Sequence, residues 1–190
     1  AIGLDIDGES SSEEFGYSVS ISSDGDRIAI GAPNNGDIGT VSGQTRVYQW
    51  SGSNWYKLGN SISGESGGDL SGKSISLSGD GDFLAIGALD NDGNGTASGH
   101  VRVYKWNGSS WIQLGVDLDG ENPSDYSGNS VSINYNGSSL LIGAYGNDGN
   151  GSGSGHIRVF EWNGYAWVQK GQEHSRCNTT NKKNIRRRTA

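Results

Sequence analysis

The feature that most constrains this chain is a repeat with a period of 56 residues. The segments "GYSVSISSDGDRIAIGA" from Gly16, "GKSISLSGDGDFLAIGA" from Gly72 and "GNSVSINYNGSSLLIGA" from Gly128 align without gaps. The match continues through "SGQTRVYQWSGSNW", "SGHVRVYKWNGSSW" and "SGHIRVFEWNGYAW", so the repeat is a whole structural unit. A period of this length is typical of solenoids, propellers and arrays, in which neighbouring units bury each other's apolar faces.

Each repeat predicts four strands and contains no segment with helical periodicity. In the first repeat, apolar and polar residues alternate over strand A (17–22) and strand B (27–32), which an Asp-Gly turn joins. Strand C (45–50) follows a longer loop, and strand D begins at Trp55 after a tight turn. We expect Trp50 and Trp55, like their equivalents, to pair across this hairpin and to pack between sheets. Platforms for stacking sugars are the alternative.

Four antiparallel strands per repeat predict an all-β fold made of β-propeller blades, because each small sheet must bury both faces against its neighbours. Three repeats are too few to close a ring, which typically holds about 4–8 blades. Two arrangements remain open: half of a two-chain, six-bladed ring, or a partial ring cut from a longer array. We assign residues 1–171 to the three-blade segment, with 1–15 as the end of a preceding D strand and its D–A loop, and 172–190 to a basic tail.

The amino-acid composition supports turn-rich β structure and limits the classes of partner that we expect. Gly accounts for 33 of 190 residues, and six Trp and eight Tyr argue against disorder. Residues 1–169 carry 7 basic and 20 acidic side chains, whereas 170–190 carry 7 and 1. The acidic body should repel nucleic acid, and the basic end is interpreted as a solvated terminus. We therefore expect no nucleic-acid partner and, without an apolar run of about 18 residues, no direct membrane insertion.

Two short motifs bracket the first A–B hairpin: Phe15-Gly16 before it and Gly31-Ala32-Pro33 at its end. They resemble the FG-GAP repeat of integrin α-subunit propellers and of repeat arrays in large microbial surface proteins. The resemblance covers residues 1 to about 169, and "SGHVRVYKWNG" is closer to the microbial arrays. It implies a propeller that binds a protein or glycan. It also implies calcium in the A–B turn, but that turn is too short here to enclose a metal.

The up-and-down order of the strands places the B–C and D–A loops on one rim. This rim is long-looped, glycine-rich and acidic, which is the usual setting for binding on a rigid scaffold. The candidate ligand-binding residues on it are Asp37, Asp90, Asp92, Asp117, Asp119 and Asp148.

One stretch of this rim, "DNDGNG" at 90–95, alternates oxygen-bearing side chains with glycines that permit a tight wrap around calcium. The third repeat keeps part of the pattern. Calcium is the only cofactor we expect, and the alternative is an Asx-type turn in which these side chains bond their own backbone. The predicted calcium ligands are Asp90, Asp92, Asn94, Asp148 and Asn150.

His100 and His156 recur at one repeat position, where the first repeat has Gln44. A buried or loop-anchoring hydrogen-bonding role fits all three residues better than a catalytic or metal-binding pair. Arg46 and its equivalents are expected to make one repeated contact from strand C. Because no catalytic triad or phosphate-binding loop is evident, we expect a binding module and no enzyme. A glycan hydrolase or lyase that uses rim carboxylates is the second hypothesis, and a structural spacer the third.

Five Asn-x-Ser/Thr sequons, together with the resemblance, predict an extracellular or cell-surface location. The single cysteine, Cys177, does not indicate the redox compartment. The chain opens with Ala, which suggests a fragment or a processed piece. The expected partners are a protein or carbohydrate ligand, and either a second copy that closes a six-bladed ring or neighbouring repeats of a longer chain.

Overall fold

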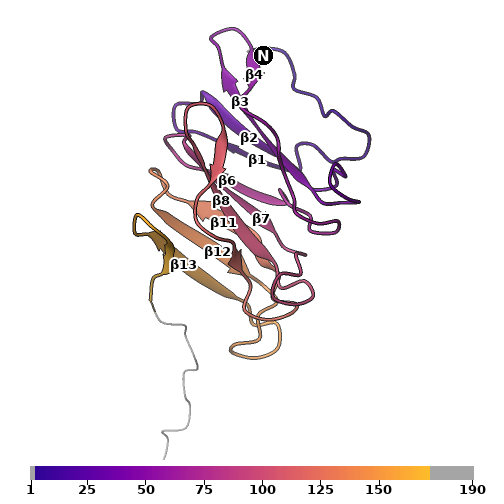
Figure 1. The fold of residues 1–190 in the computed structure, drawn as a ribbon, viewed down its shortest axis with the longest axis vertical. Coiled ribbons are helices and arrows are strands. Elements are labelled where there is room, and N and C mark those ends of the chain that lie inside the picture. The colour runs from indigo at the N-terminus through magenta and orange to yellow at the C-terminus, as the bar shows by residue number, and fades with distance from the viewer. Residues whose placement is uncertain (1–2, 172–190) are drawn as a thin grey trace, which may run out of the picture.

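The computed structural model describes residues 3–171, and these form strands and turns without a helix. The strands make three antiparallel sheets that follow one another in chain order from the N-terminal end (Figure 1). Each sheet corresponds to one sequence repeat and is called a blade below. Within residues 3–171 there is no helix that could cross a membrane.

Blade 1 contains β1 (Ser18–Ile21), β2 (Arg27–Ala32), β3 (Gln44–Trp50), β4 (Trp55–Lys57) and β5 (Ile62–Ser63). Blade 2 contains β6 (Ser74–Leu77), β7 (Phe83–Ala88), β8 (His100–Trp106), β9 (Trp111–Gln113) and β10 (Leu118–Asp119). Blade 3 contains β11 (Ser127–Ile133), β12 (Ser139–Ala144), β13 (His156–Trp162) and β14 (Trp167–Gln169). The prediction of all-β blades with strands A to D in order is confirmed.

Strand D is broken in the first two blades, which the sequence did not predict. β4 and β5 both pair with β3, but the register shifts by two residues between them. The break contains Gly59, whose φ is +77°, and a Cβ there would lie 2.9 Å from Trp106 of the next blade. Glycine is needed at this position because it accepts a positive φ and leaves room for the indole.

Neighbouring blades pack face to face through apolar side chains. Each blade has a front face, which packs on the preceding blade, and a back face, which packs on the following one. Ile75 and Leu77 on the front face of blade 2 join Ala29 and Val47 on the back face of blade 1 in one buried cluster. Blades 2 and 3 repeat this arrangement in a second cluster. Burial of both faces of the middle sheet is therefore the main source of cohesion in the stack.

Serines on strand A bring adjacent blades close together. The Ser18 hydroxyl donates to the Gly72 carbonyl over 2.6 Å, and the Ser20 hydroxyl accepts the Leu77 N–H over 2.9 Å. The same two bonds recur between blades 2 and 3. A Cβ at Gly31 would lie 2.0 Å from the Gly72 carbonyl oxygen, so the backbones are in direct contact. The recurring Ser pattern of strand A thus serves close packing.

The tryptophans of the C–D hairpins pair as predicted. Trp50 lies opposite Trp55 with ring centroids 5.3 Å apart, and the corresponding pairs in blades 2 and 3 are separated by 5.5 and 5.6 Å. Trp111 donates through Nε1 to the Leu58 carbonyl of the preceding blade over 3.0 Å. Trp111 and Trp167 are buried, so these rings bridge blades and present no open stacking face.

Residues 3–15 lie against blade 1 without forming a strand. Gly3 is next to Trp50, and the Phe15 ring meets Tyr48 edge-on with centroids 6.4 Å apart. The expected end of a D strand in this segment is not observed within the described residues. The basic tail predicted for 172–190 lies outside the residues that the structure describes.

The two ends of the stack expose the positions that the middle blade buries. Val19 and Ile21 of blade 1 are 70% and 61% exposed, whereas their equivalents in blade 2 are below 10%. On the back face of blade 3, Leu141 and Ile157 are 42% and 68% exposed, whereas the equivalent residues of blade 2 are fully buried. Each end of the described stack therefore carries half of a blade–blade interface.

Candidate functional site

The B–C and D–A loops meet on one rim, as the strand order predicted. Backbone bonds tie the B–C loops of blades 1 and 2 to the D–A loop that follows each of them. In blade 1, Gly68 donates to the Thr40 carbonyl over 2.9 Å and Leu70 to the Val41 carbonyl over 3.2 Å. Val41 and Leu70 adopt positive φ values of 56° and 54°. These loops are thus held in defined and strained conformations that the surrounding hydrogen bonds impose.

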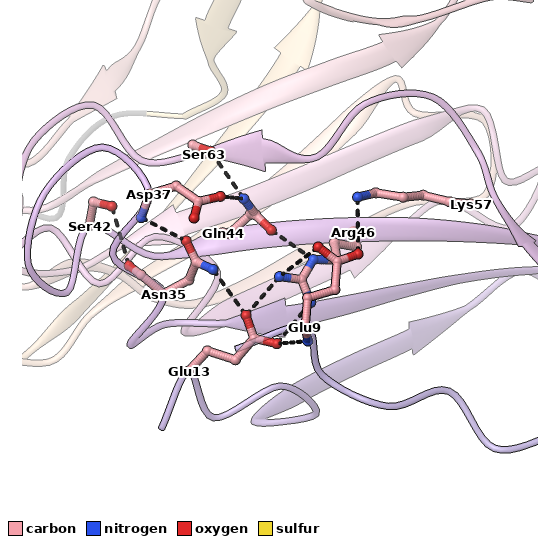
Figure 2. A network of polar contacts seen from close by, with 9 residues as sticks. All are labelled: Glu9, Glu13, Asn35, Asp37, Ser42, Gln44, Arg46, Lys57 and Ser63. Carbon is pink, nitrogen blue, oxygen red and sulfur yellow. Dashed lines mark hydrogen bonds and ion pairs between the residues drawn. The ribbon is translucent and has the colours of Figure 1, made fainter. Parts of the chain in front are cut away.

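In blade 1 this rim is closed by a buried polar network (Figure 2). Arg46 donates to both carboxylate oxygens of Glu13, over 2.9 and 2.7 Å, and Asn35 donates to the same carboxylate over 2.9 Å. Gln44 accepts from Arg46 Nε over 2.7 Å and donates to Asp37 over 2.6 Å. Asp37, a predicted ligand-binding residue, is therefore already engaged within the protein.

The ion pair sets the protonation state of Glu13. The hydrogen bonds from Arg46 lower the pKa of Glu13 to about 2, and those from Asn35 and the Glu9 N–H act in the same direction. Burial alone would raise this pKa, but the donors outweigh it. Glu13 is 3% exposed and Arg46 is 1% exposed, so the pair belongs to the interior of the rim.

Blade 2 has the same backbone but three different side chains at the equivalent positions. Asp69 takes the place of Glu13 and is one methylene shorter, Gly93 replaces Asp37, and His100 replaces Gln44. Asp69 accepts from Asn91 over 3.1 Å, while the Arg102 guanidinium donates to the Ser63 carbonyl over 2.8 Å. Two of these changes, at Asp69 and Gly93, shorten the side chain, and the rim of blade 2 is open.

The opening is a cleft of about 500 Å³ with an acidic lining. It brings together four of the six predicted ligand-binding residues, whereas Asp37 and Asp148 lie in the B–C loops of the other two blades. The residues with acidic, amide or imidazole side chains that line it are Glu65, Asp69, Asp90, Asn91, Asp92, Asp117, Asp119 and His100.

The buried position predicted for the Gln/His site is confirmed for Gln44 and His100, and the hydrogen-bonding role is confirmed for Gln44. His100 is 1% exposed, and its Nε2 is buried without a hydrogen-bond partner in the described chain. Its Nδ1 lies 3.9 Å from Glu65 Oε2 and 3.8 Å from Asp117 Oδ2. Burial lowers the pKa of His100, and the charge of Arg102 lowers it further, so a neutral imidazole is favoured.

Two of the five side chains predicted to bind calcium, Asp92 and Asp148, make Asx-type contacts. Asp92 accepts the Ala97 N–H over 2.8 Å, and Asp148 accepts the Gly153 N–H over 2.6 Å. Asn94 donates to the Gly120 carbonyl over 2.8 Å, which ties the B–C loop to the next D–A loop. At Asn150 it is the backbone N–H that donates to the Ser154 hydroxyl, over 3.2 Å. These contacts occupy some ligand oxygens, and calcium binding here stays a prediction.

The repeated contact predicted for the strand C arginines is present in blades 2 and 3, and blade 1 makes a different contact. Arg102 donates to the Ser63 carbonyl, and Arg158 donates to the equivalent Asp119 carbonyl over 2.6 Å. Arg46 instead makes the ion pair with Glu13. The Glu13 side chain is one methylene longer than that of Asp69, so it reaches Arg46 and binds it.

Sequence reasoning did not single out Glu65 or Asp69, although both line the cleft. The signal was present in the repeat: acidic residues recur at the Glu65 position in all three repeats, and again four residues later. Neither recurrence belongs to a known short motif, and only the fold shows that the D–A loop reaches the B–C loop.

Three stacked antiparallel blades, each with strands A to D in order and with long loops on one rim, define a protein of the β-propeller class. Residues 5–48 and 117–160 match the family model of the FG-GAP repeat. The chain therefore carries FG-GAP repeats, as the resemblance implied.

Solved structures agree on the fold. A crystal structure described as a provisionally assigned 6-phosphogluconolactonase from Bacteroides fragilis is similar with a TM-score of 0.54 at 15% identity, covering 80% of this chain and 36% of that one. Hydrazine synthase of Kuenenia stuttgartiensis is similar with a TM-score of 0.52 at 12% identity, covering 87% of this chain and 38% of that one. The chain thus spans little more than a third of either. No curated protein matches it in sequence.

Proposed function

We propose that this chain is a non-enzymatic β-propeller binding module, extracellular or on a cell surface, that binds a protein or glycan through the acidic cleft of blade 2. The observation that carries the proposal is the contrast between equivalent rims. Blade 1 closes its rim with a neutralised network, whereas blade 2 leaves Glu65, Asp69 and four further aspartates around an open cleft. Carboxylates gathered around a concave site attract cationic groups.

The charge of the cleft limits the kinds of ligand that fit it. Six carboxylates line the cleft together with His100, whose neutral form is favoured, and Arg102 forms an ion pair with one of these carboxylates, Glu65. A basic protein surface would match this charge directly. A glycan would bind through its hydroxyl groups with a bridging cation, and calcium at Asp90, Asp92 and Asn94 would supply one.

The experiment compares two sets of four neutralised aspartates. The rim set is Asp90→Asn, Asp92→Asn, Asp117→Asn and Asp119→Asn, and the control set is Asp24→Asn, Asp26→Asn, Asp80→Asn and Asp82→Asn in the A–B turns. Both proteins are applied, with and without calcium, to arrays of glycans and of extracellular proteins. We expect the rim set alone to lose the binding of the unchanged chain. Equal binding by the rim set and the unchanged chain would contradict the proposal.

A catalytic role is tested on the same samples. The enzyme hypothesis rests on the acid-rich rim, because glycoside hydrolysis uses a pair of carboxyl groups. Incubation with a polysaccharide panel is expected to release no new reducing or unsaturated ends. Turnover that the rim set abolishes would assign the cleft to catalysis.

We further propose that the open end faces are covered by blades of the same kind, either from a second copy of this chain or from adjacent repeats of a longer one. The support is continuity with the two interfaces inside the stack. Ser130 and Gly143 on the back face of blade 3 occupy the positions at which Ser18 and Gly31 contact blade 2. Buried area and hydrogen bonds would then recur at each end.

A further inference from the structure

We infer that Glu65, His100 and Asp117 form a binding site for one divalent transition-metal ion, with zinc the best match. The inference goes beyond the proposed ligand and beyond the predicted calcium residues, because it concerns three different side chains. It does not depend on what binds the cleft, since the metal is tested alone.

The three side chains converge on one point although none of them bonds directly to another. His100 Nδ1 lies 3.9 Å from Glu65 Oε2 and 3.8 Å from Asp117 Oδ2, which is too long for a hydrogen bond. Two ligand atoms bound to one tetrahedral zinc ion at about 2.1 Å each lie roughly 3.4 Å apart, so His100 Nδ1 is within about 0.5 Å of that separation from each carboxylate oxygen. All three ligand atoms lie within 4.8 Å of one another, so small side-chain rotations complete the site.

Each carboxylate is oriented by a donor that leaves the correct oxygen free. Arg102 Nη1 lies 3.5 Å from Glu65 Oε1, and Gln113 Nε2 donates to Asp117 Oδ1 over 2.7 Å. The remaining oxygens, Oε2 and Oδ2, are the two that face His100. Donors outside the ligand set orient ligands in this way in known metal sites.

His100 supplies the second, independent observation. Its side chain is 1% exposed, it lines the cleft, and its Nε2 has no hydrogen-bond partner among the described residues. Nδ1 is the ring nitrogen that faces the two carboxylates, so it would bind the metal, and the imidazole proton would then lie on Nε2. A buried imidazole that lines the cleft without a direct hydrogen bond to either carboxylate is available as a ligand.

The ligand set selects the class of metal. Calcium and magnesium favour all-oxygen sites, whereas imidazole combined with carboxylates suits zinc and its first-row neighbours. Three protein ligands on the wall of an open cleft leave the fourth position of zinc facing the cleft. A ligand of the rim could then coordinate the metal directly.

The repeats help to choose the substitutions. Blade 1 has Glu9, Gln44 and Ser61 at the three equivalent positions, so the imidazole and one carboxylate are missing there. Blade 3 repeats part of the set, with His156 Nδ1 lying 3.8 Å from Glu121 Oε2, and the third position, 173, lies outside the described residues. His100→Gln introduces the residue that blade 1 tolerates, and Asp117→Asn keeps the shape of the side chain while removing its charge.

The test is isothermal titration of the full chain with zinc chloride, with cobalt absorbance as a second readout of imidazole coordination. Every sample carries Cys177→Ser, which removes a thiol that could bind zinc elsewhere. Asp26→Asn is the matched control, because it removes one exposed charge from an A–B turn, outside the cleft and away from the three ligands. Circular dichroism checks that each variant is folded.

We expect one equivalent of zinc to bind, and we expect His100→Gln and Asp117→Asn each to weaken this binding by at least about 10-fold. The control Asp26→Asn should change it by less than about 3-fold. If His100→Gln fails to fold, Asp117→Asn alone decides. Zinc binding that survives both substitutions, or no zinc binding by the unchanged chain, would overturn the inference. Neither result bears on glycan or protein binding by the rim, which is measured without zinc.

Discussion

Arg46 and Glu13 form a two-point ion pair inside the rim of blade 1, with Nη1 2.9 Å and Nη2 2.7 Å from the two carboxylate oxygens. The residues are 33 positions apart in the sequence, and the pair joins the D–A loop to strand C. Because both side chains are buried, neither can replace its partner by hydrogen bonds to water. The pair therefore fixes the loop that blade 2 leaves free to line a cleft.

Replacing Glu13 by alanine should destabilise the chain strongly, because it leaves Arg46 buried and uncompensated. We expect a loss of about 3–5 kcal/mol in the free energy of unfolding, measured by urea denaturation. The matched control is Glu9→Ala, since Glu9 is about half exposed and lies 3.5 Å from the same guanidinium. Its loss should be below about 1 kcal/mol. Equal losses in the two variants would contradict the role assigned to the pair.

The same pair should make stability depend on pH in the acid range. The pKa of Glu13 is about 2 in the folded chain against an ordinary value of 4.5, so the unfolded state binds more protons between these values. The stabilisation from Glu13 is fully present above pH 4.5 and is lost as the pH falls toward 2. It amounts to at most about 3 kcal/mol.

The measurement compares urea unfolding of the unchanged chain and of Glu13→Gln at about pH 6 and about pH 3, on either side of the ordinary glutamate pKa. The advantage of the unchanged chain should be smaller at the lower pH. An advantage that is constant over this range would show that the pKa of Glu13 is not lowered.

Replacing Val41 by glycine should stabilise the chain. Val41 is β-branched and has a φ of +56°, whereas the third repeat has Gly153 at the same position with a φ of +60°. Glycine relieves the left-handed strain, but its greater flexibility in the unfolded chain offsets part of this gain. The net gain in the free energy of unfolding should be about 0.5–1 kcal/mol. Val19→Gly, at an exposed strand position, should instead lose stability. A lower melting temperature for Val41→Gly would contradict the prediction.

Alanine at Gly59 should cost more than alanine at Gly52. Both glycines have positive φ, +77° and +91°, so both variants incur roughly 1–2 kcal/mol of backbone strain. Only at Gly59 would the new Cβ also meet Trp106 at 2.9 Å, whereas Gly52 faces open space. We expect thermal unfolding to show an additional loss of about 1 kcal/mol or more for Gly59→Ala, with a changed tryptophan emission. Equal losses of stability in the two variants would show that the Trp106 side chain moves aside at no cost.

The exposed end faces should cause association in solution. If a second copy covers them, light scattering coupled to size exclusion should give a mass near twice 20.0 kDa that falls on dilution. Val19→Asp combined with Ile21→Asp should abolish the dimer, because these side chains would occupy the buried positions of Ile75 and Leu77. Tyr56→Asp, at an exposed position of β4, is the control and should leave it intact. A monomer at every concentration would assign the end faces to adjacent repeats of a longer chain.

The repeat alone determined the architecture of this protein. Alternating residues placed β2 at its observed bounds, the turn residues placed Trp50 opposite Trp55, and the strand order sorted the loops onto the correct rim. These features are local or recur at fixed spacing, so each is visible along one stretch of sequence. The break in strand D was missed because it depends on Trp106, which belongs to the next blade.

The contents of the rim were decided only by the tertiary structure. The sequence showed an acidic rim, but it treated Asp37 like Asp90, although one is held in a network and the other lines an open cleft. It also gave Gln44 and His100 the same role. The difference arises because Glu13 reaches Arg46 while Asp69, one methylene shorter, leaves Arg102 to another partner. Contacts between loops depend on such lengths in three dimensions, and periodicity carries no information about them.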